Sequence, residues 1–210
     1  MTFHAEALND AQKAILPALG EFASDRGFYL GGGTAVALYL GHRRSVDFDW
    51  FTGDEMPDPA ILAQEARTSG LEIESFETGR DTLRAVAGGV QVSFMRYPYP
   101  LMSPLADWPD YSTRLAALDD LACMKLAAVG QRGSRRDFID LHAIALQHRP
   151  LSEIVELCKR KYSNSEISHL LLGLIYFDDA EEEAMPAMLT GLDWDQVKRR
   201  FREWAKELAG

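Results

Sequence analysis

The sequence feature that most limits what this chain can fold into is a run of three glycines, Gly31-Gly32-Gly33, between an apolar segment at 28–30 and an apolar helical pattern at 34–40. A glycine run costs backbone entropy, so it predicts a positive φ angle or a close approach of the backbone. A strand that turns into a helix here would point backbone N–H groups at an anion. We therefore expect a triphosphate to bind at this turn, with an ordinary strand-to-helix turn as the alternative.

Two carboxylates follow on an alternating segment. Val46, Phe48 and Trp50 alternate with Asp47 and Asp49, as in a strand with one apolar and one acidic face. Residues i and i+2 of a strand lie roughly 7 Å apart on one face, close enough for both carboxylates to bind one Mg²⁺ or Mn²⁺ ion. The alternative is a polar strand face that happens to hold two acids. Two like charges near a core favour the cation, because each raises the pKa of the other.

The turn before the acids carries cationic and hydroxyl groups. Arg43 and Ser45, beside His42 and Arg44, are placed to hold phosphate oxygens opposite the metal, unless this is only a solvated basic turn. The chain has no G-x-x-x-x-G-K-[ST] motif, and the three glycines lack the G-x-G-x-x-G spacing. The sequence thus excludes both of the usual nucleotide-binding fingerprints.

The pattern of apolar residues predicts an α/β half followed by an α-helical half, an α+β fold. The expected helices are 5–23, 34–40, 60–69, 119–131, 135–147, 152–161, 165–175, 180–189 and 193–208. The expected strands are 28–30, 46–51, 71–76, 83–87 and 90–96. Four prolines in 97–113 predict a crossing loop rather than a strand or helix. We place the domain boundary there, with an α/β core at 1–113 and a helical domain at 114–210.

The helical half contributes a lysine and two more acids. Lys125 lies on the apolar stripe of its helix, so its ammonium must enter a cleft or extend to solvent. Asp137 and Asp140 lie three residues apart on one face of the next helix, and Arg136 is four residues before Asp140. These charges either lock the two helices together or contact substrate, and the residues alone leave both readings open.

Composition limits the partners. The 210 residues include 47% hydrophobic side chains, enough to bury a core. A net charge of −10 excludes an overall basic field, so RNA or DNA contact would need a local patch. Cys123 and Cys158 have no C-x-x-C partner, which argues against zinc and against a disulfide scaffold. Without a leader pattern or about 18 consecutive apolar residues, we expect a cytoplasmic protein with no membrane contact.

Together these motifs resemble the AbiEii/AbiGii-type nucleotidyltransferases, abortive-infection toxins of the DNA-polymerase-β-like superfamily. The resemblance covers about 30–146 in the family's order. The residues that carry it are Gly32-Gly33-Thr34-Ala35 with Leu38, His42-Arg43-x-Ser45-x-Asp47-x-Asp49, Lys125, Arg132-Gly133, and Asp137-Phe138-x-Asp140-Leu141.

The resemblance implies a minimal nucleotidyltransferase core, a mixed sheet flanked by helices, with roles for particular residues. Gly32, Gly33 and Thr34 would hold the triphosphate, with Arg43 and Ser45 nearby. The candidate catalytic residues are then Asp47 and Asp49 as Mg²⁺ ligands, Lys125 as a phosphate contact, and Asp137 and Asp140 in the later motif. The resemblance also implies an antitoxin partner and, in some members, transfer of nucleotides onto tRNA.

One departure from the superfamily pattern concerns a third carboxylate on a later core strand. In 90–96, Val92 and Phe94 occupy the apolar face, so Ser93 stands where the acid is expected. A neutral hydroxyl cannot accept a proton at pH 7 as a carboxylate can. Either one metal suffices, or catalysis is weak, or another acid serves; the candidates are Glu72, Glu74, Asp137 and Asp140.

The leading hypothesis is an Mg²⁺-dependent nucleotidyltransferase that transfers NMP from an NTP to an acceptor hydroxyl, with toxin function. The acceptor would be tRNA, another RNA or a small molecule. One alternative, prompted by Ser93, is a nucleotide-binding or interaction module with weak or no catalysis. The other is a small-molecule adenylyltransferase that acts on an antibiotic, which the absence of a basic surface favours over an RNA acceptor.

Overall fold

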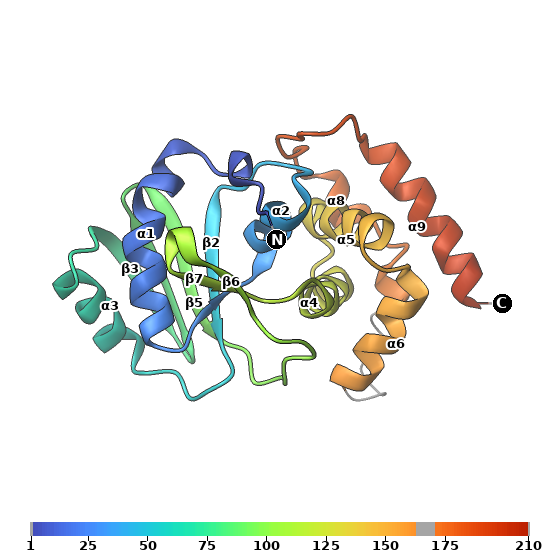
Figure 1. Ribbon diagram of the computed structural model, residues 1–210. Coiled ribbons are helices and arrows are strands. Elements are labelled where there is room, and N and C mark those ends of the chain that lie inside the picture. The colour runs from blue at the N-terminus through green and yellow to red at the C-terminus, as the bar shows by residue number, and fades with distance from the viewer. Residues whose placement is uncertain (1, 163–170, 210) are drawn as a thin grey trace.

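The computed structural model describes residues 2–162 and 171–209, and a seven-stranded mixed sheet forms one half of it, beside a helical half (Figure 1). The strand order is β3-β4-β5-β2-β1-β7-β6. The strands are β1 (Tyr29–Leu30), β2 (Asp47–Thr52), β3 (Ile73–Gly79), β4 (Thr82–Ala87), β5 (Val90–Arg96), β6 (Ala106–Trp108) and β7 (Thr113–Leu115). Strand β2 is parallel to β5 and antiparallel to β1, so the sheet is mixed, as expected.

The helices cover both faces of this sheet and continue into a helical half. They are α1 (Asp10–Asp25), α2 (Gly32–Leu40), α3 (Pro59–Thr68), α4 (Leu118–Gln131), α5 (Arg135–Gln147), α6 (Leu151–Lys161), α8 (Asp178–Glu181) and α9 (Trp194–Ala209), with short 3-10 helices at Ala5–Ala7 and Pro109–Tyr111. Figure 1 shows α1 and α3 on one side of the sheet and α2 on the other, facing α4 and α5. Helix α2 therefore joins the sheet to the helical half.

The two faces of β2 differ as the alternation predicts. Phe48 and Trp50 are fully buried, and the Trp50 ring stacks on Phe94 of β5 with centroids 6.4 Å apart. This aromatic layer extends to Phe22 of α1, which packs edge-on against Phe94. Burial of such rings stabilises the sheet under α1 and leaves the opposite face of β2 for Asp47 and Asp49.

Two expectations about secondary structure were wrong. The segment 97–113 is not all loop, because β6 pairs with β7 at the edge of the sheet. The prolines at 104 and 109 flank β6 without interrupting it, as an edge strand allows. The helix expected at 180–189 ends with α8 at Glu181. Pro186 disfavours a helical Met185, and 187–188 pair with the chain at Arg43 and Arg44 instead of continuing a helix.

Three further expectations depend on where elements begin and end. The expected helix 5–23 divides into the Ala5–Ala7 turn and α1, whose start is capped by Asn9. Most of the helix expected at 165–175 lies outside the described residues, and 171–173 are helical. The expected boundary at 113/114 falls within β7. The division into two domains itself stays a prediction. No helix within the described ranges has the length and apolar character to cross a membrane.

Candidate functional site

The glycine turn brings backbone against the site's own side chains. Gly31 N donates to Asp49 O at 2.8 Å, and α2 begins at Gly32 with φ +61°. A β-carbon on Gly32 would clash with the Asp49 carboxylate, and one on Gly33 would clash with the Arg43 guanidinium. The glycines are therefore required for close approach to Asp49 and Arg43, and they also leave the first N–H groups of α2 open to a ligand.

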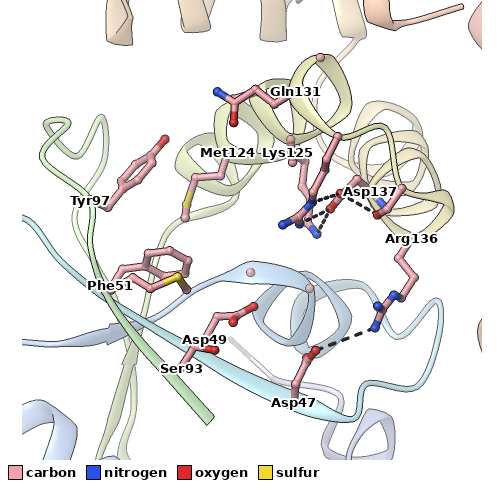
Figure 2. Close-up of a pocket in the computed structure, with 18 of the residues that line it drawn as sticks. Asp47, Asp49, Phe51, Ser93, Tyr97, Met124, Lys125, Gln131, Arg136 and Asp137 are labelled. Carbon is pink, nitrogen blue, oxygen red and sulfur yellow. Dashed lines mark hydrogen bonds and ion pairs between the residues drawn. The ribbon is translucent and has the colours of Figure 1, made fainter. Parts of the chain in front are cut away.

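The two acids of β2 lie on one face beside this turn, at the floor of a cavity (Figure 2). Asp49 is half-buried, and burial together with the negative charge of Asp47 raises its pKa to about 6. Asp47 is more open and lies 3.9 Å from the Arg136 guanidinium. Lys125 and Arg132 offset this rise in the pKa of Asp49 only in part, so the carboxylate pair suits a further positively charged ligand.

Thr34 and Ser45 position the first residue of β2. The two buried hydroxyls lie 2.5 Å apart, and Thr34 Oγ1 donates to Asp47 O at 2.5 Å. Neither residue lines the cavity. The structure thus gives both residues a part in holding Asp47, and their direct contact with a nucleotide stays a prediction.

A buried charge network joins this half to the helices. Asp140 accepts hydrogen bonds from Arg43 Nε at 2.7 Å and Nη2 at 2.8 Å, and from His42 Nε2 at 2.8 Å. Its other contact is Lys125 Nζ at 2.8 Å. Burial alone would raise the pKa of Asp140, but Arg43 and Lys125 hold it well below its usual range. Asp140 is therefore a fixed anion between α2, α4 and α5, and it does not line the cavity.

Asp137 is similarly surrounded by donors, but it lines the cavity. Lys125 Nζ, Arg132 Nε and Ser134 Oγ lie 2.8, 2.7 and 2.7 Å from its oxygens. Despite burial, Lys125 and Arg132 hold the pKa of Asp137 far below its usual range. Lys125 is itself buried and paired with both acids, so it does not extend to solvent. The expected i,i+4 pair of Arg136 with Asp140 does not form, because Asp140 faces the core and Arg136 faces Asp47.

Ser93 faces the cavity, as the alternation of β5 predicts. It is the register partner of Asp49 across the parallel β2–β5 pair. Of the acids expected to replace the missing carboxylate, Glu72 and Glu74 do not line the cavity, and Asp137 and Asp140 are tied to cations. The structure adds Glu183, which lines the cavity and accepts a hydrogen bond from Arg135 N at 3.0 Å.

The cavity has a volume of about 850 Å³ and lies between the sheet and α4. Of the residues expected at the site it brings together Gly32, Gly33, Arg43, Asp47, Asp49, Lys125 and Asp137. Sequence reasoning missed several other lining residues, of which the chief are Phe51, Arg84, Tyr97, Tyr99, Met124 and Glu183. Only the position of Phe51, two residues after Asp49 on the same strand face, carried a signal that could have found it.

The two carboxylates of Asp47 and Asp49 suit Mg²⁺ or Mn²⁺, which take part of their ligands from substrate and water. They are too few for a metal ion that is bound by protein side chains alone. Across residues 2–162 and 171–209, no cluster of three or more His, Cys, Asp or Glu residues is arranged as a metal cage. Asp47 and Asp49 offer two carboxylates beside the glycine turn, and Mg²⁺ takes one or two carboxylates with phosphate oxygens and water. The raised pKa of Asp49 is consistent with that arrangement.

Comparison with known proteins extends this picture. The family model "Nucleotidyl transferase AbiEii toxin, Type IV TA system" matches residues 14–207. An uncharacterized protein, aq_aa25, of Aquifex aeolicus (strain VF5) is 36% identical over 181 residues, 86% of this chain and 87% of that protein.

Two solved structures share the fold. MenT4, a nucleotidyltransferase toxin from Mycobacterium tuberculosis H37Rv, has a TM-score of 0.60 at 17% identity, covering 95% of this chain and 82% of MenT4. JHP933 from Helicobacter pylori has a TM-score of 0.57 at 18% identity, covering 96% and 93% of the two chains. The fold class and the resemblance inferred from the motifs are thereby confirmed, and the chain belongs to the AbiEii nucleotidyltransferase toxin family.

Proposed function

We propose that the protein transfers a nucleoside monophosphate from an NTP to an acceptor hydroxyl in a reaction that depends on Mg²⁺ or Mn²⁺. The observation that carries the proposal is the placement of Asp47 and Asp49 on one strand face beside the N-terminus of α2, inside one cavity. Acids for a cation and N–H groups for phosphates are the two halves of a metal–triphosphate site. Family membership supports the same reaction class.

In this reaction the acceptor oxygen forms a bond to the α-phosphorus, and the bond from that phosphorus to the bridging oxygen of pyrophosphate breaks. The hydroxyl proton passes to solvent, and pyrophosphate leaves with the electron pair. Phosphoryl-type transfer depends chiefly on positioning and charge stabilisation. A bound divalent cation would supply Lewis acidity at the phosphate oxygens, and Asp47 and Asp49 would hold it.

The remaining charged residues divide into ligand contacts and supports. Arg132 and Arg136 stand at the cavity with partly exposed side chains, so their guanidinium groups can approach phosphate oxygens. Lys125 and Arg43 line the cavity but are bound to Asp137 and Asp140. We assign them to the positive wall behind the triphosphate, with the two acids as the groups that orient them.

The direct test is labelling of an acceptor by purified protein, Mg²⁺ and each α-labelled NTP in a cell lysate. Asp47→Asn should abolish labelling while leaving Tm within a few degrees, because Asp47 is partly exposed and at the cavity floor. Arg44→Gln is a control, since Arg44 does not line the cavity. Full labelling by Asp47→Asn would refute the assignment. The labelled species would identify the acceptor as tRNA, another RNA or a small molecule.

A second candidate function follows from Ser93 beside Asp49. A protein with two carboxylates at the site would bind metal–NTP but turn over slowly or not at all, acting as a nucleotide-binding partner, for example of an antitoxin. That function predicts NTP binding by calorimetry without transfer to any acceptor. Measured transfer that Asp47→Asn abolishes would exclude it.

A further inference from the structure

The cavity has two ends with different chemistry. Gly32, Asp47 and Arg136 stand at the polar end, which the proposed function uses. The other end, which we call the aromatic slot, is lined by Phe51, Tyr97, Tyr99, Met124, Ala127 and Ala128. Figure 2 shows Phe51, Tyr97 and Met124 together on the side of the cavity away from Arg136. Neither metal binding nor phosphate binding explains this end.

One wall of the slot is a chain of aromatic rings. The ring of Phe51 lies 5.8 Å from that of Tyr97, and the ring of Tyr97 lies 5.0 Å from that of Tyr99. The ring of Tyr99 meets Tyr162 edge-on at 4.8 Å, and the hydroxyls of Tyr97 and Tyr162 share a hydrogen bond. Tyr99 remains 36% exposed, so this anchored chain ends in a ring that a ligand can reach.

The other wall is one side of α4, on which two alanines lie between two longer side chains. Met124, Ala127, Ala128 and Gln131 follow at i, i+3, i+4 and i+7, the spacing of one helix face, and all four line the cavity. The two alanines are only partly buried, although Ala127 packs against the core. Because the alanines stop at the β-carbon, the space between this face and the tyrosines stays open.

The loop that carries Tyr99 is held in place by a buried ion pair. Lys161 Nζ lies 2.6 Å from Asp120 Oδ1 and donates to Pro100 O at 2.7 Å. The Asp120 carboxylate accepts from the backbone N–H groups of Met102 and Ser103 at 2.9 and 3.1 Å. Such a pair adds little net stability, because desolvation offsets its attraction. Its contacts with Pro100, Met102 and Ser103 connect the loop next to the slot to α4 and α6.

We propose that the aromatic slot binds a nucleobase, stacked against the Tyr97–Tyr99 wall and in contact with the alanine face of α4. Every base has a π face, so such a slot tolerates different bases, and the exposed Gln131 amide at its rim can hydrogen-bond a base edge. A cavity of about 850 Å³ is large for a ligand site, which leaves room for a base beside the phosphates. The base belongs either to the NTP or to the end of an RNA acceptor.

This inference rests on the proposed function, which assigns the polar end of the cavity to metal and triphosphate. One measurement tests the base slot and the metal–triphosphate site separately. Binding of Mn²⁺-tripolyphosphate, which has the phosphates but no base, and of each Mn²⁺-NTP is measured by calorimetry. If the base in the slot is that of the NTP, at least one NTP binds roughly 5- to 150-fold more tightly than tripolyphosphate, the usual contribution of one stacked base. Absence of binding by both would refute the metal–triphosphate site, and equal affinity would refute the NTP base as occupant.

Two variants test the walls. Tyr99→Ala removes a partly exposed ring, and Ala127→Leu adds a larger side chain on the α4 wall of the slot. If the base is that of the NTP, both should weaken NTP binding by at least fivefold and leave tripolyphosphate binding within twofold, whereas Tyr99→Phe should keep the NTP affinity. An equal loss for NTP and tripolyphosphate would contradict a base-specific slot.

The other possible source of the base, the end of an RNA acceptor, is tested with a short single-stranded oligoribonucleotide in the absence of NTP. If the base is the acceptor's, the same two variants weaken oligoribonucleotide binding by at least fivefold and leave NTP binding unchanged. If neither ligand responds to Tyr99→Ala or Ala127→Leu, the slot binds no base and the inference is wrong.

Discussion

Asp49 of β2 and Ser93 of β5 are register partners in a parallel strand pair, and both side chains face the cavity. Ser93→Asp would place a third carboxylate there. In the absence of metal the added charge should lower Tm, because Asp49 is already an acid with a raised pKa. With Mn²⁺ present, binding should tighten by roughly tenfold or more, since the number of ligand charges sets metal affinity. Calorimetry and thermal unfolding with and without EDTA measure both effects, and Ser93→Asn is the uncharged control.

Gly32 and Gly27 both have positive φ angles, +61° and +75°, but only Gly32 is crowded. Gly27→Ala should cost about 1 to 2 kcal/mol for the left-handed backbone alone. Gly32→Ala should cost more, because its β-carbon would also displace the Asp49 carboxylate, and it should weaken Mn²⁺ binding. Chemical denaturation and metal titration of both variants make the comparison. Equal stability loss with unchanged metal affinity would contradict the close approach of Gly32 to Asp49.

The Arg136 guanidinium lies 3.9 Å from Asp47 and is about half exposed. Arg136→Ala should have opposite effects on two ligands. Metal alone should bind a few-fold more tightly, because an exposed pair worth about 0.2–1 kcal/mol no longer competes for Asp47. Metal–NTP should bind more weakly, because a cation near the phosphates is lost. A change of the same sign for both ligands, measured by calorimetry, would contradict this role.

The buried network around Asp140 should dominate stability among the charged residues. Asp140→Asn leaves Arg43 and Lys125 without their shared anion, a loss of roughly 3–5 kcal/mol in the free energy of unfolding. In a chain of this size that corresponds to a drop in Tm on the order of 10 °C. Glu203→Gln breaks an exposed pair with Arg200 and is the matched control, expected to cost less than about 1 kcal/mol.

His142 of α5 packs against Trp204 of α9, with ring centroids 5.7 Å apart. Burial, together with the charges of Arg200 and His42, lowers the pKa of His142 from 6.5 to about 4. Between those two pH values the unfolded chain binds more protons than the folded one, so the free energy of unfolding falls as pH is lowered from 6.5 toward 4. His142→Gln should flatten this part of the pH–stability curve. Parallel curves for the two proteins would show that His142 does not titrate on unfolding.

Much of the fold followed from local pattern. The alternation at 46–51 predicted which side chains of β2 are buried, and Phe48 and Trp50 are. The same rule placed Ser93 at the cavity, because strand side chains alternate whatever the rest of the fold does. Local pattern failed where pairing across the sheet or contact with a distant loop outweighs it, at β6 and at the early end of α8.

For the candidate site, the sequence by itself determined the two acids on one strand face and the glycines that let α2 begin against Asp49, since spacing and backbone freedom are local properties. Only the tertiary structure decided that Lys125 is locked between Asp137 and Asp140. It alone brought Tyr99 and the alanines of α4 into the lining of one cavity. Those arrangements depend on how the helical half packs against the sheet, and residues far apart in the chain acquire their distances only from that packing.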